Sequence, residues 1–242
     1  MVSVRDHYEN HLAPLYAWIC GGVKQNLEKN RTFFKAHNIQ PLDTGRAFDL
    51  GAGCGFQSIP LAEIGFSIVA MDLSARLLEE LKNNASHLFI ETICDDILNF
   101  STYSRGEIEL VVCMGDTLTH LETLTKVKAL LQQVSTGLAP GGRLILSFRN
   151  LSQPLVGLDR FIPVRNNDTT IFTCFLEYGR NSVEVHDIIY EKKRGRWVLH
   201  KSSYRKSRIS PEWIQSRLQQ IGFTIEYYDD KRGLIDVIAR KK

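Results

Sequence analysis

The chain has 242 residues, of which 43% are hydrophobic and 24% are charged, and its formal net charge is +3. This composition is typical of a globular protein and argues against a disordered chain, and no apolar run is long enough to span a bilayer. The net charge is too small to indicate a nucleic-acid partner by itself. The length fits one α/β domain with an insertion or two small domains, and we favour one domain.

The cysteines show no C-x-x-C spacing, and most of them lie beside apolar runs. This pattern favours reduced core residues over a disulfide framework, a zinc site or a catalytic thiol. The first residues, Arg5, Asp6 and His7 among them, lack the apolar core of a signal peptide. We therefore expect a cytoplasmic protein without a bound metal. The cysteines are Cys20, Cys54, Cys94, Cys113 and Cys174.

Residues 6–39 have apolar side chains at helical spacing, with a break expected at Gly21 and Gly22. A strand is then predicted near 46–50, and it ends at Asp49 and Leu50. Gly51, Gly53 and Gly55 follow, and a helix is expected near 57–64. Glycine permits positive φ and a close approach of a ligand to the backbone, and the helix start offers unpaired N–H groups. A dinucleotide fingerprint would need a third glycine where Phe56 stands.

Strands and helices alternate through the stretch 45–148, which predicts a doubly wound, mostly parallel Rossmann-like sheet. Ligands of such sheets bind beyond the carboxyl ends of the strands. Asp49, Asp72, Asp95 and Asp96 all follow expected strands, and their charges would repel a pyrophosphate but suit a cationic ligand rich in hydroxyl and amine donors. The further strands are expected near 67–71, 88–93, 108–113 and 142–148, and the further helices near 74–84 and 122–138.

The alternation stops after residue 148. Three strands near 169–176, 182–190 and 197–207, joined by glycine-containing turns, predict an antiparallel β cap over residues 149–208, inserted in the core. A helix over 211–221 and an antiparallel hairpin, 223–228 with 233–239, then complete the edge of the sheet. The expected core thus comprises 45–148 and 209–242.

The stretch Phe48–Ser58, together with the spaced acids, resembles the class I S-adenosylmethionine-dependent methyltransferases. The resemblance runs from about Phe48 to Arg149 and implies S-adenosylmethionine as the cofactor. It implies that the glycine turn holds the methionine part, Asp72 the ribose hydroxyls and Asp95 the adenine amine. In many such enzymes the segment before the first strand covers the cofactor, so a helical lid is expected over residues 1–44. The implied cofactor-binding residues are Asp49, Gly51, Gly53, Gly55, Asp72, Leu73, Asp95, Asp96, Ile97, Met114 and Tyr16.

Two further segments, 113–121 and 147–150, are similar to segments of glycine N-methyltransferases. In those enzymes an arginine after the fifth strand binds the substrate carboxylate, and Arg149 matches it. Asp116 stands where they carry asparagine, which puts glycine itself in question, because an acid repels a carboxylate but can hold an amine or a hydroxyl. The predicted catalytic residues are Asp116, His120 and Arg149.

Each of these assignments has a structural alternative. His120 can cap a helix or pack on the strand end instead of serving as a base, and Arg149 can pair with a structural acid. Tyr8, Tyr16 and Trp18 would suit a lid, although aromatic residues at helical spacing are usually core. His186 in the cap is a second candidate base.

We predict methyl transfer to a nitrogen or oxygen of a small metabolite. The basic stretch from Lys192 to Arg208 raises an RNA or protein methyltransferase as an alternative, although lysine and arginine commonly protect exposed hairpins. The nucleic-acid partner is disfavoured because the chain lacks an Asn-Pro-Pro-Tyr signature. A binding module that holds S-adenosylmethionine without turnover is the other alternative, and the sequence leaves the oligomeric state open.

Overall fold

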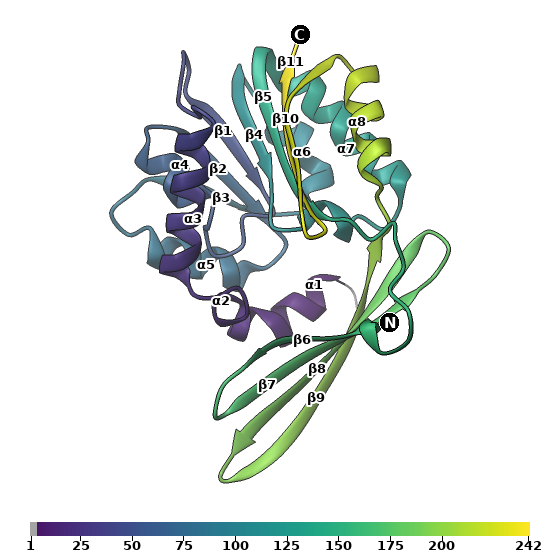
Figure 1. Ribbon diagram of the computed structural model, residues 1–242. Coiled ribbons are helices and arrows are strands. Elements are labelled where there is room, and N and C mark those ends of the chain that lie inside the picture. Colours follow the sequence, from purple (N-terminus) through teal and green to yellow (C-terminus); the bar gives the residue numbers. More distant parts are fainter. Residues whose placement is uncertain (1–3) are drawn as a thin grey trace.

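A computed structural model describes residues 4–242, which form two β-sheets with a helical segment between them (Figure 1). The larger sheet has seven strands in the order β10-β11-β5-β4-β1-β2-β3. β1 to β5 run parallel, and β11 is antiparallel to both β5 and β10. The predicted fold class is therefore confirmed. The first three residues of the expected lid lie outside the described residues.

Helices cover both faces of the larger sheet. Side chains of α6, α7 and α8 pack with one buried cluster, and side chains of α3, α4 and α5 pack with the other. The strands are β1 (Arg46–Leu50), β2 (Ser67–Asp72), β3 (Ile90–Cys94), β4 (Ile108–Cys113), β5 (Leu138–Arg149), β10 (Phe223–Lys231) and β11 (Leu234–Lys241). The helices are α3 (Val23–Ala36), α4 (Ser58–Glu63), α5 (Ala75–Asn84), α6 (Phe100–Tyr103), α7 (Leu124–Gly137) and α8 (Pro211–Gln220).

Local sequence signals explain most of these boundaries. The side chains of Ser74, Thr123 and Ser210 cap α5, α7 and α8 by accepting a hydrogen bond from a backbone N–H in the first turn. Two features differ from the sequence prediction. β5 begins at Leu138, because Leu138 already pairs with Ile108 and a bulge absorbs the residues up to Gly142, among which Gly141 has φ of 77°. The short η3 (Ile97–Asn99) and α6 were not predicted, since each is too brief to show a period.

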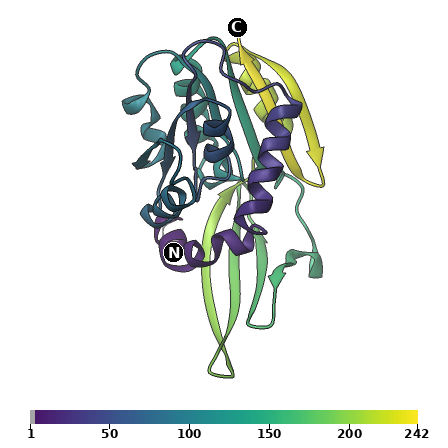
Figure 2. The ribbon, with the colours of Figure 1, turned by 90° about the vertical axis from the view of Figure 1, so that its left-hand side faces the viewer.

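The N-terminal segment lies between the two sheets (Figures 1 and 2). It comprises α1 (Val4–His7), the π-helical η1 (Tyr8–Leu12), the 3₁₀-helical η2 (Ala13–Leu15) and α2 (Tyr16–Ile19). Glu9 accepts a hydrogen bond from the Ser74 hydroxyl of the core at 2.6 Å. His7 is fully buried, with Nε2 3.0 Å from Asp187 of the cap. The segment is thus attached on both sides.

The smaller sheet is the predicted cap, with four antiparallel strands in the order β6-β7-β8-β9. They are β6 (Phe161–Asn166), β7 (Thr170–Tyr178), β8 (Ser182–Lys193) and β9 (Arg196–Ser207), and η5 (Gly157–Arg160) precedes them. β6 was not predicted, because Pro163 weakens its strand signal; it is an edge strand with a bulge after that proline. The described helices include none long and apolar enough to cross a membrane.

Candidate active site

A cavity of about 810 Å³ lies at the carboxyl edge of the larger sheet, beneath the N-terminal segment. The glycine turn after β1 borders it, fixed by hydrogen bonds from the amides of Gly51 and Ala52 to the Met71 carbonyl at 2.8 and 3.0 Å. Gly51 has φ of 81°, and a Cβ there would lie 2.3 Å from the Thr117 side chain, so this position requires glycine. The predicted site residues that line the cavity are Tyr16, Gly51, Gly53, Asp72, Leu73, Asp96, Ile97 and His120.

Asp72 shapes this cavity at the end of β2. Its two carboxylate oxygens accept hydrogen bonds from the backbone N–H groups of Gly53 and Ser74, each at 2.8 Å. Burial raises the pKa of Asp72, against the lowering effect of these hydrogen bonds. The carboxylate therefore holds the glycine turn in place and also faces the cavity, where it can accept hydrogen bonds from hydroxyl groups of a ligand.

The two acids after β3 lie in different surroundings. Asp95 accepts hydrogen bonds from the Tyr103 hydroxyl at 2.9 Å and from the Asn99 amide, and the first of these is the main cause of its lowered pKa. Asp95 does not line the cavity, whereas its neighbours Asp96 and Ile97 do. Asp96 also caps η3 by accepting from the Leu98 N–H at 2.9 Å. At this edge, Asp96 is thus the acid placed to meet a ligand.

Asp49 lies beneath the glycine turn and does not line the cavity. It is 1% exposed, and Oδ2 accepts a hydrogen bond from the Ser58 hydroxyl at 2.6 Å. Its Oδ1 is buried without a hydrogen-bond partner among residues 4–242. Burial raises the pKa of Asp49 from 3.8 to about 7, although the Ser58 hydrogen bond opposes the shift. Asp49 therefore keeps its proton to a higher pH than an exposed aspartate does.

This raised pKa predicts a pH-dependent stability. A carboxyl whose pKa is higher in the folded than in the unfolded protein stabilises the fold most at low pH. The contribution is lost as the pH rises from about 4 to about 7, by up to roughly 4 kcal/mol if Asp49 keeps its full shift. In Asp49→Asn, we expect urea denaturation to show a smaller fall in stability over this range. Asp168→Asn, on an exposed turn, should behave as wild type; equal pH profiles for all three proteins would contradict the expectation.

Tyr8 and His120 also line the cavity. The Tyr8 hydroxyl lies 3.0 Å from Nε2 of His120, and the His120 ring stacks on Tyr204 with centroids 5.3 Å apart. Burial, with the Lys206 charge, lowers the pKa of His120 to about 3, so the imidazole is neutral at physiological pH. Its Nδ1 is buried without a partner in the described part of the chain. His120 is thus suited to hold a hydroxyl in place and is a weak proton acceptor.

Asp116 lies just outside the cavity, in an ion pair with Lys206 of β9. Its Oδ1 accepts hydrogen bonds from the Thr119 hydroxyl at 2.8 Å and from the Arg149 N–H at 2.9 Å. Burial opposes ionisation of Asp116, but Lys206 and these contacts hold the pKa of that carboxyl below its usual range. Both oxygens are therefore already engaged, and Asp116 joins the cap to the core.

The remaining predicted site residues do not line the cavity. Arg149 contributes its backbone N–H to Asp116, while its side chain is exposed at the end of β5. Met114 is buried, and its carbonyl accepts from the Thr117 hydroxyl at 3.1 Å. Gly55 lies under the turn, where an added Cβ would be 2.8 Å from Leu81, so it serves close packing.

Some cavity residues were not among the predicted site residues. Tyr8 was singled out only as a lid aromatic, and Thr117 lies in the segment 113–121 but was given no role. Arg205 belongs to the basic stretch of the cap, where its neighbour Lys206 proves to be buried against Asp116. Arg208 of that stretch donates to backbone carbonyls of Leu151, Ser152, Gly179 and Arg180. The basic stretch is therefore partly structural.

Similarity to known proteins agrees with this site. Residues 47–142 match the family model described as a methyltransferase domain. The chain is 32% identical over 125 residues to a glycine/sarcosine N-methyltransferase from Halorhodospira halochloris, a match that covers 50% of this chain and 46% of that protein. It is 30% identical over 107 residues to the enzyme of that name from Aphanothece halophytica, covering 43% of this chain and 40% of that protein. The chain thus spans less than half the length of these relatives.

Solved structures resemble almost the whole chain in fold. The CcbJ methyltransferase from Streptomyces caelestis has a TM-score of 0.81 at 16% identity, covering 98% of both chains. CalS10, an amino pentose methyltransferase from Micromonospora echinaspora solved with bound S-adenosylmethionine, has a TM-score of 0.69 at 15% identity, covering 95% of this chain and 96% of that one.

The strand order, the glycine turn and the acids at the carboxyl edge define a class I methyltransferase fold. Within it, residues 47–142 match the methyltransferase domain model, and the predicted resemblance to class I S-adenosylmethionine-dependent methyltransferases is confirmed.

Proposed function

We propose that this protein binds S-adenosylmethionine and transfers its methyl group to a nitrogen or oxygen of a small metabolite. One observation carries the proposal: a single cavity joins the glycine turn and Asp72 of the core to Tyr8 and His120 beneath the cap. A cavity of about 810 Å³ lies in the upper part of the range usual for small-molecule sites. It therefore offers room for a cofactor and a small acceptor together.

The residues present fit this cofactor. Gly51 and Gly53 leave space where side chains would meet Thr117 and Tyr16. Asp72 offers carboxylate oxygens to ribose hydroxyls, and Asp96 with Ile97 forms the wall where an adenine would lie. Because Asp95 is engaged by Tyr103 and Asn99, we assign the adenine side to Asp96 in place of Asp95. The aromatic ring of Tyr16, stacked on Phe56 with centroids 5.9 Å apart, closes the methionine end.

When bound, S-adenosylmethionine supplies a methyl group made electrophilic by a sulfonium. Transfer would form a bond from the acceptor's lone pair to that carbon, and the electron pair of the carbon–sulfur bond would stay on sulfur. The acceptor then releases a proton to solvent. The chain's part is to hold the reactants in line and exclude water, which can supply ~7–11 kcal/mol of the barrier reduction. We assign Tyr8, oriented by His120, to position the acceptor.

The contacts of Asp116 and His120 argue against the general-base roles that the sequence predicted for them. Asp116 is engaged by Lys206, and His120 is a weak base, so we propose positioning by the chain and proton release to solvent instead of general-base catalysis by either residue. The role of Arg149 as a receptor for a substrate carboxylate stays a prediction, because its side chain lies outside the cavity lining.

Nitrogen is the acceptor atom that we favour, because the relatives are named as N-methyltransferases. An N-terminal methyltransferase of cypemycin from Streptomyces is also 28% identical over 161 residues, covering 60% of this chain and 64% of that protein. This similarity keeps a peptide acceptor as the second candidate. All five cysteines are free, which supports a reducing compartment, and we propose the cytoplasm.

The function is tested by incubating the purified protein with methyl-labelled S-adenosylmethionine and a cell extract. We expect label in the small-molecule fraction, from which the product can be identified. Label found only in protein or only in RNA would show that the acceptor belongs to that class and is not a small metabolite. With an RNA acceptor, the activity of the enzyme should fall steeply as the salt concentration rises. Cofactor binding by calorimetry without label above a heat-killed control, in extracts from several sources, would favour a binding module.

The Tyr8–His120 contact predicts a specific kinetic defect. Tyr8→Phe removes the hydroxyl that His120 holds, so we expect kcat to fall roughly 10- to 100-fold through loss of alignment. Cofactor affinity, measured by calorimetry, should change little, because the aromatic ring remains. Tyr228→Phe, on the exposed edge strand β10, is the matched control and should keep wild-type kcat. An unchanged kcat in Tyr8→Phe would remove Tyr8 from the reaction.

A further inference from the structure

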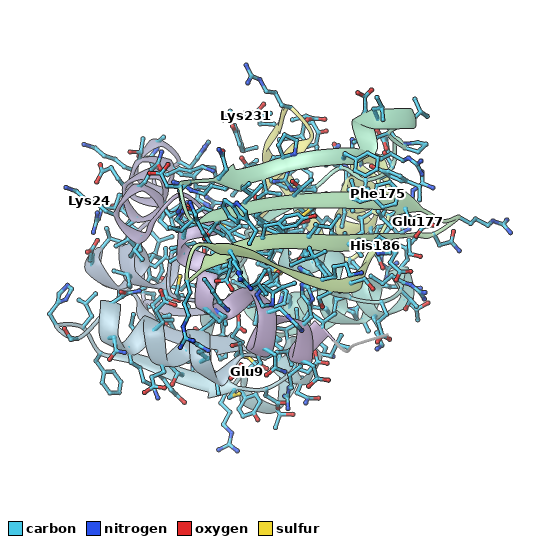
Figure 3. All side chains as sticks on the ribbon, turned by 90° about the horizontal axis from the view of Figure 1, so that it is seen from below. Glu9, Lys24, Phe175, Glu177, His186 and Lys231 are labelled. Atoms are coloured by element: carbon cyan, nitrogen blue, oxygen red, sulfur yellow. The ribbon has the colours of Figure 1, made fainter. Side chains whose placement is uncertain are left out.

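A row of three polar side chains, the cap row, crosses the face of the cap sheet that packs on the N-terminal segment. Cys174 of β7 pairs with Asp187 of β8, which pairs with Ser202 of β9. Side chains alternate along a strand, so the neighbouring Phe175 and His186 lie on the outward face of the sheet, which Figure 3 shows from below. The cap row therefore faces the N-terminal segment.

His7 of the N-terminal segment contacts the cap row with both of its ring nitrogens. Nδ1 lies 2.6 Å from the Ser202 hydroxyl oxygen, and Nε2 lies 3.0 Å from Oδ2 of Asp187. The other Asp187 oxygen, Oδ1, accepts a hydrogen bond from the Cys174 thiol at 3.0 Å. His7 is 0% exposed and Asp187 is 1% exposed. The polar atoms of both side chains are thus engaged inside the protein.

Packing between the segment and the cap does not require these polar groups. Leu12 of the segment already forms a buried apolar cluster with Phe172 and Ile189 of the cap. A buried histidine–aspartate pair costs desolvation free energy that two apolar side chains would avoid. What the pair adds is direction, because hydrogen bonds to atoms on β8 and β9 hold the imidazole at one place and in one orientation.

Tyr8, which lines the cavity, follows His7 directly in the chain. The chain changes there from α1 to the π-helical η1, and π-helical turns are rare and frequently occur at functional sites. The rings of His7 and His120 both lie against the Tyr204 ring, with centroids 4.3 and 5.3 Å away. The Tyr8 hydroxyl meets His120 at 3.0 Å. The place of His7 on the cap therefore determines where Tyr8 enters the cavity.

We propose that His7 is a positioning residue for methyl transfer: held by the cap row, it places Tyr8 where Tyr8 aligns the acceptor. This inference rests on the proposed function. When His7 is replaced, the segment keeps its second attachment, from Glu9 to Ser74 of the core. We therefore expect the loss of His7 to lower the rate of methyl transfer much more than the affinity for S-adenosylmethionine.

Methyl-transfer kinetics test this role, with labelled S-adenosylmethionine and the small-molecule fraction of a cell extract as the acceptor. We expect His7→Leu to lower the plateau rate roughly 10-fold, while the cofactor affinity measured by calorimetry changes less than about 3-fold. His7→Gln, whose amide can still donate to Asp187, should recover most of the rate. His11→Leu is the matched control, since the His11 ring lies 6.0 Å from the His7 ring but makes no hydrogen bond to the cap among residues 4–242. It should keep the wild-type rate.

A double-mutant cycle separates positioning from general damage. If His7 acts through Tyr8, His7→Leu should lower the plateau rate by less than about 2-fold in a Tyr8→Phe background, because the hydroxyl that it places is already gone. Equal factors in the two backgrounds would overturn the proposal. His7→Leu alone leaves Asp187 buried without its partner, so the cycle is repeated with His7→Leu combined with Asp187→Asn, which removes that charge and should be more stable.

Hydrogen–deuterium exchange of residues 8–12 gives a readout that needs no turnover. We expect exchange to be roughly 10-fold faster or more in His7→Leu, and to stay at the wild-type rate in His11→Leu. Unchanged exchange in His7→Leu would overturn the proposal. A wild type that transfers no methyl group would contradict the proposed function, while the exchange in His7→Leu would still decide whether His7 holds Tyr8 in place.

Discussion

Replacing Asp72 by alanine is expected to weaken the binding of S-adenosylmethionine by about 100-fold or more. Asp72 accepts hydrogen bonds from the Gly53 and Ser74 backbones and faces the cavity, so the variant loses both the support of the glycine turn and the acceptor for ligand hydroxyls. A hydrogen bond to a charged group contributes ~1.5–3 kcal/mol, and two of them account for a change of this size. Titration calorimetry measures the affinity directly.

The control for Asp72 is Asp95→Ala. Asp95 lies at the same edge of the sheet but is held by Tyr103 and Asn99, so its loss should change the affinity several times less than the loss of Asp72. The loss of affinity in Asp96→Ala should lie between the losses in Asp72→Ala and Asp95→Ala. Equal losses in Asp72→Ala and Asp95→Ala would show that Asp95 turns to the cofactor on binding, as the family resemblance implies. Unchanged affinity in Asp72→Ala would contradict the assignment of S-adenosylmethionine to this cavity.

The sequence signals for the core half of this cavity are local. Gly51 and Gly53 follow β1 and Asp72 ends β2, and the carboxyl ends of parallel strands meet at one edge. Neighbouring sequence signals do not decide whether Asp95 or Asp96 faces the cavity. That choice depends on Tyr103 and Asn99, which lie on elements too short to be predicted, and on a turn that directs adjacent side chains apart.

The cap half of the site could not be predicted from sequence, because its contacts join distant parts of the chain. Tyr8 meets His120 across 112 positions, and Lys206 meets Asp116 across 90. Lys206 belongs to a stretch that reads as a solvated basic strand, and only the alternation of β9 directs it inward. Arg149 shows the opposite case: the stretch from Leu144 to Phe148 is buried throughout, but the next side chain is exposed and lies outside the cavity lining.

Replacing Lys206 by methionine is expected to destabilise the fold by about 3–5 kcal/mol. Asp116 is 6% exposed and has φ of 76°, so without Lys206 a carboxylate would stay buried without its cation, at a residue already in a strained backbone conformation. Urea denaturation measures the loss. Lys231→Met removes a surface ion pair with Asp229 and should cost less than about 1 kcal/mol.

The double variant Lys206→Met with Asp116→Asn separates charge from packing. Because the uncompensated carboxylate is gone, it should be more stable than Lys206→Met alone. The pH gives a second test. The lowered pKa of Asp116 means that its stabilising contribution is present above the usual value of 3.8 and is lost as the pH falls through the lowered value. The difference in free energy of unfolding between wild type and Lys206→Met should therefore become smaller in acid. A difference that stays constant with pH would show that Lys206 acts through packing alone.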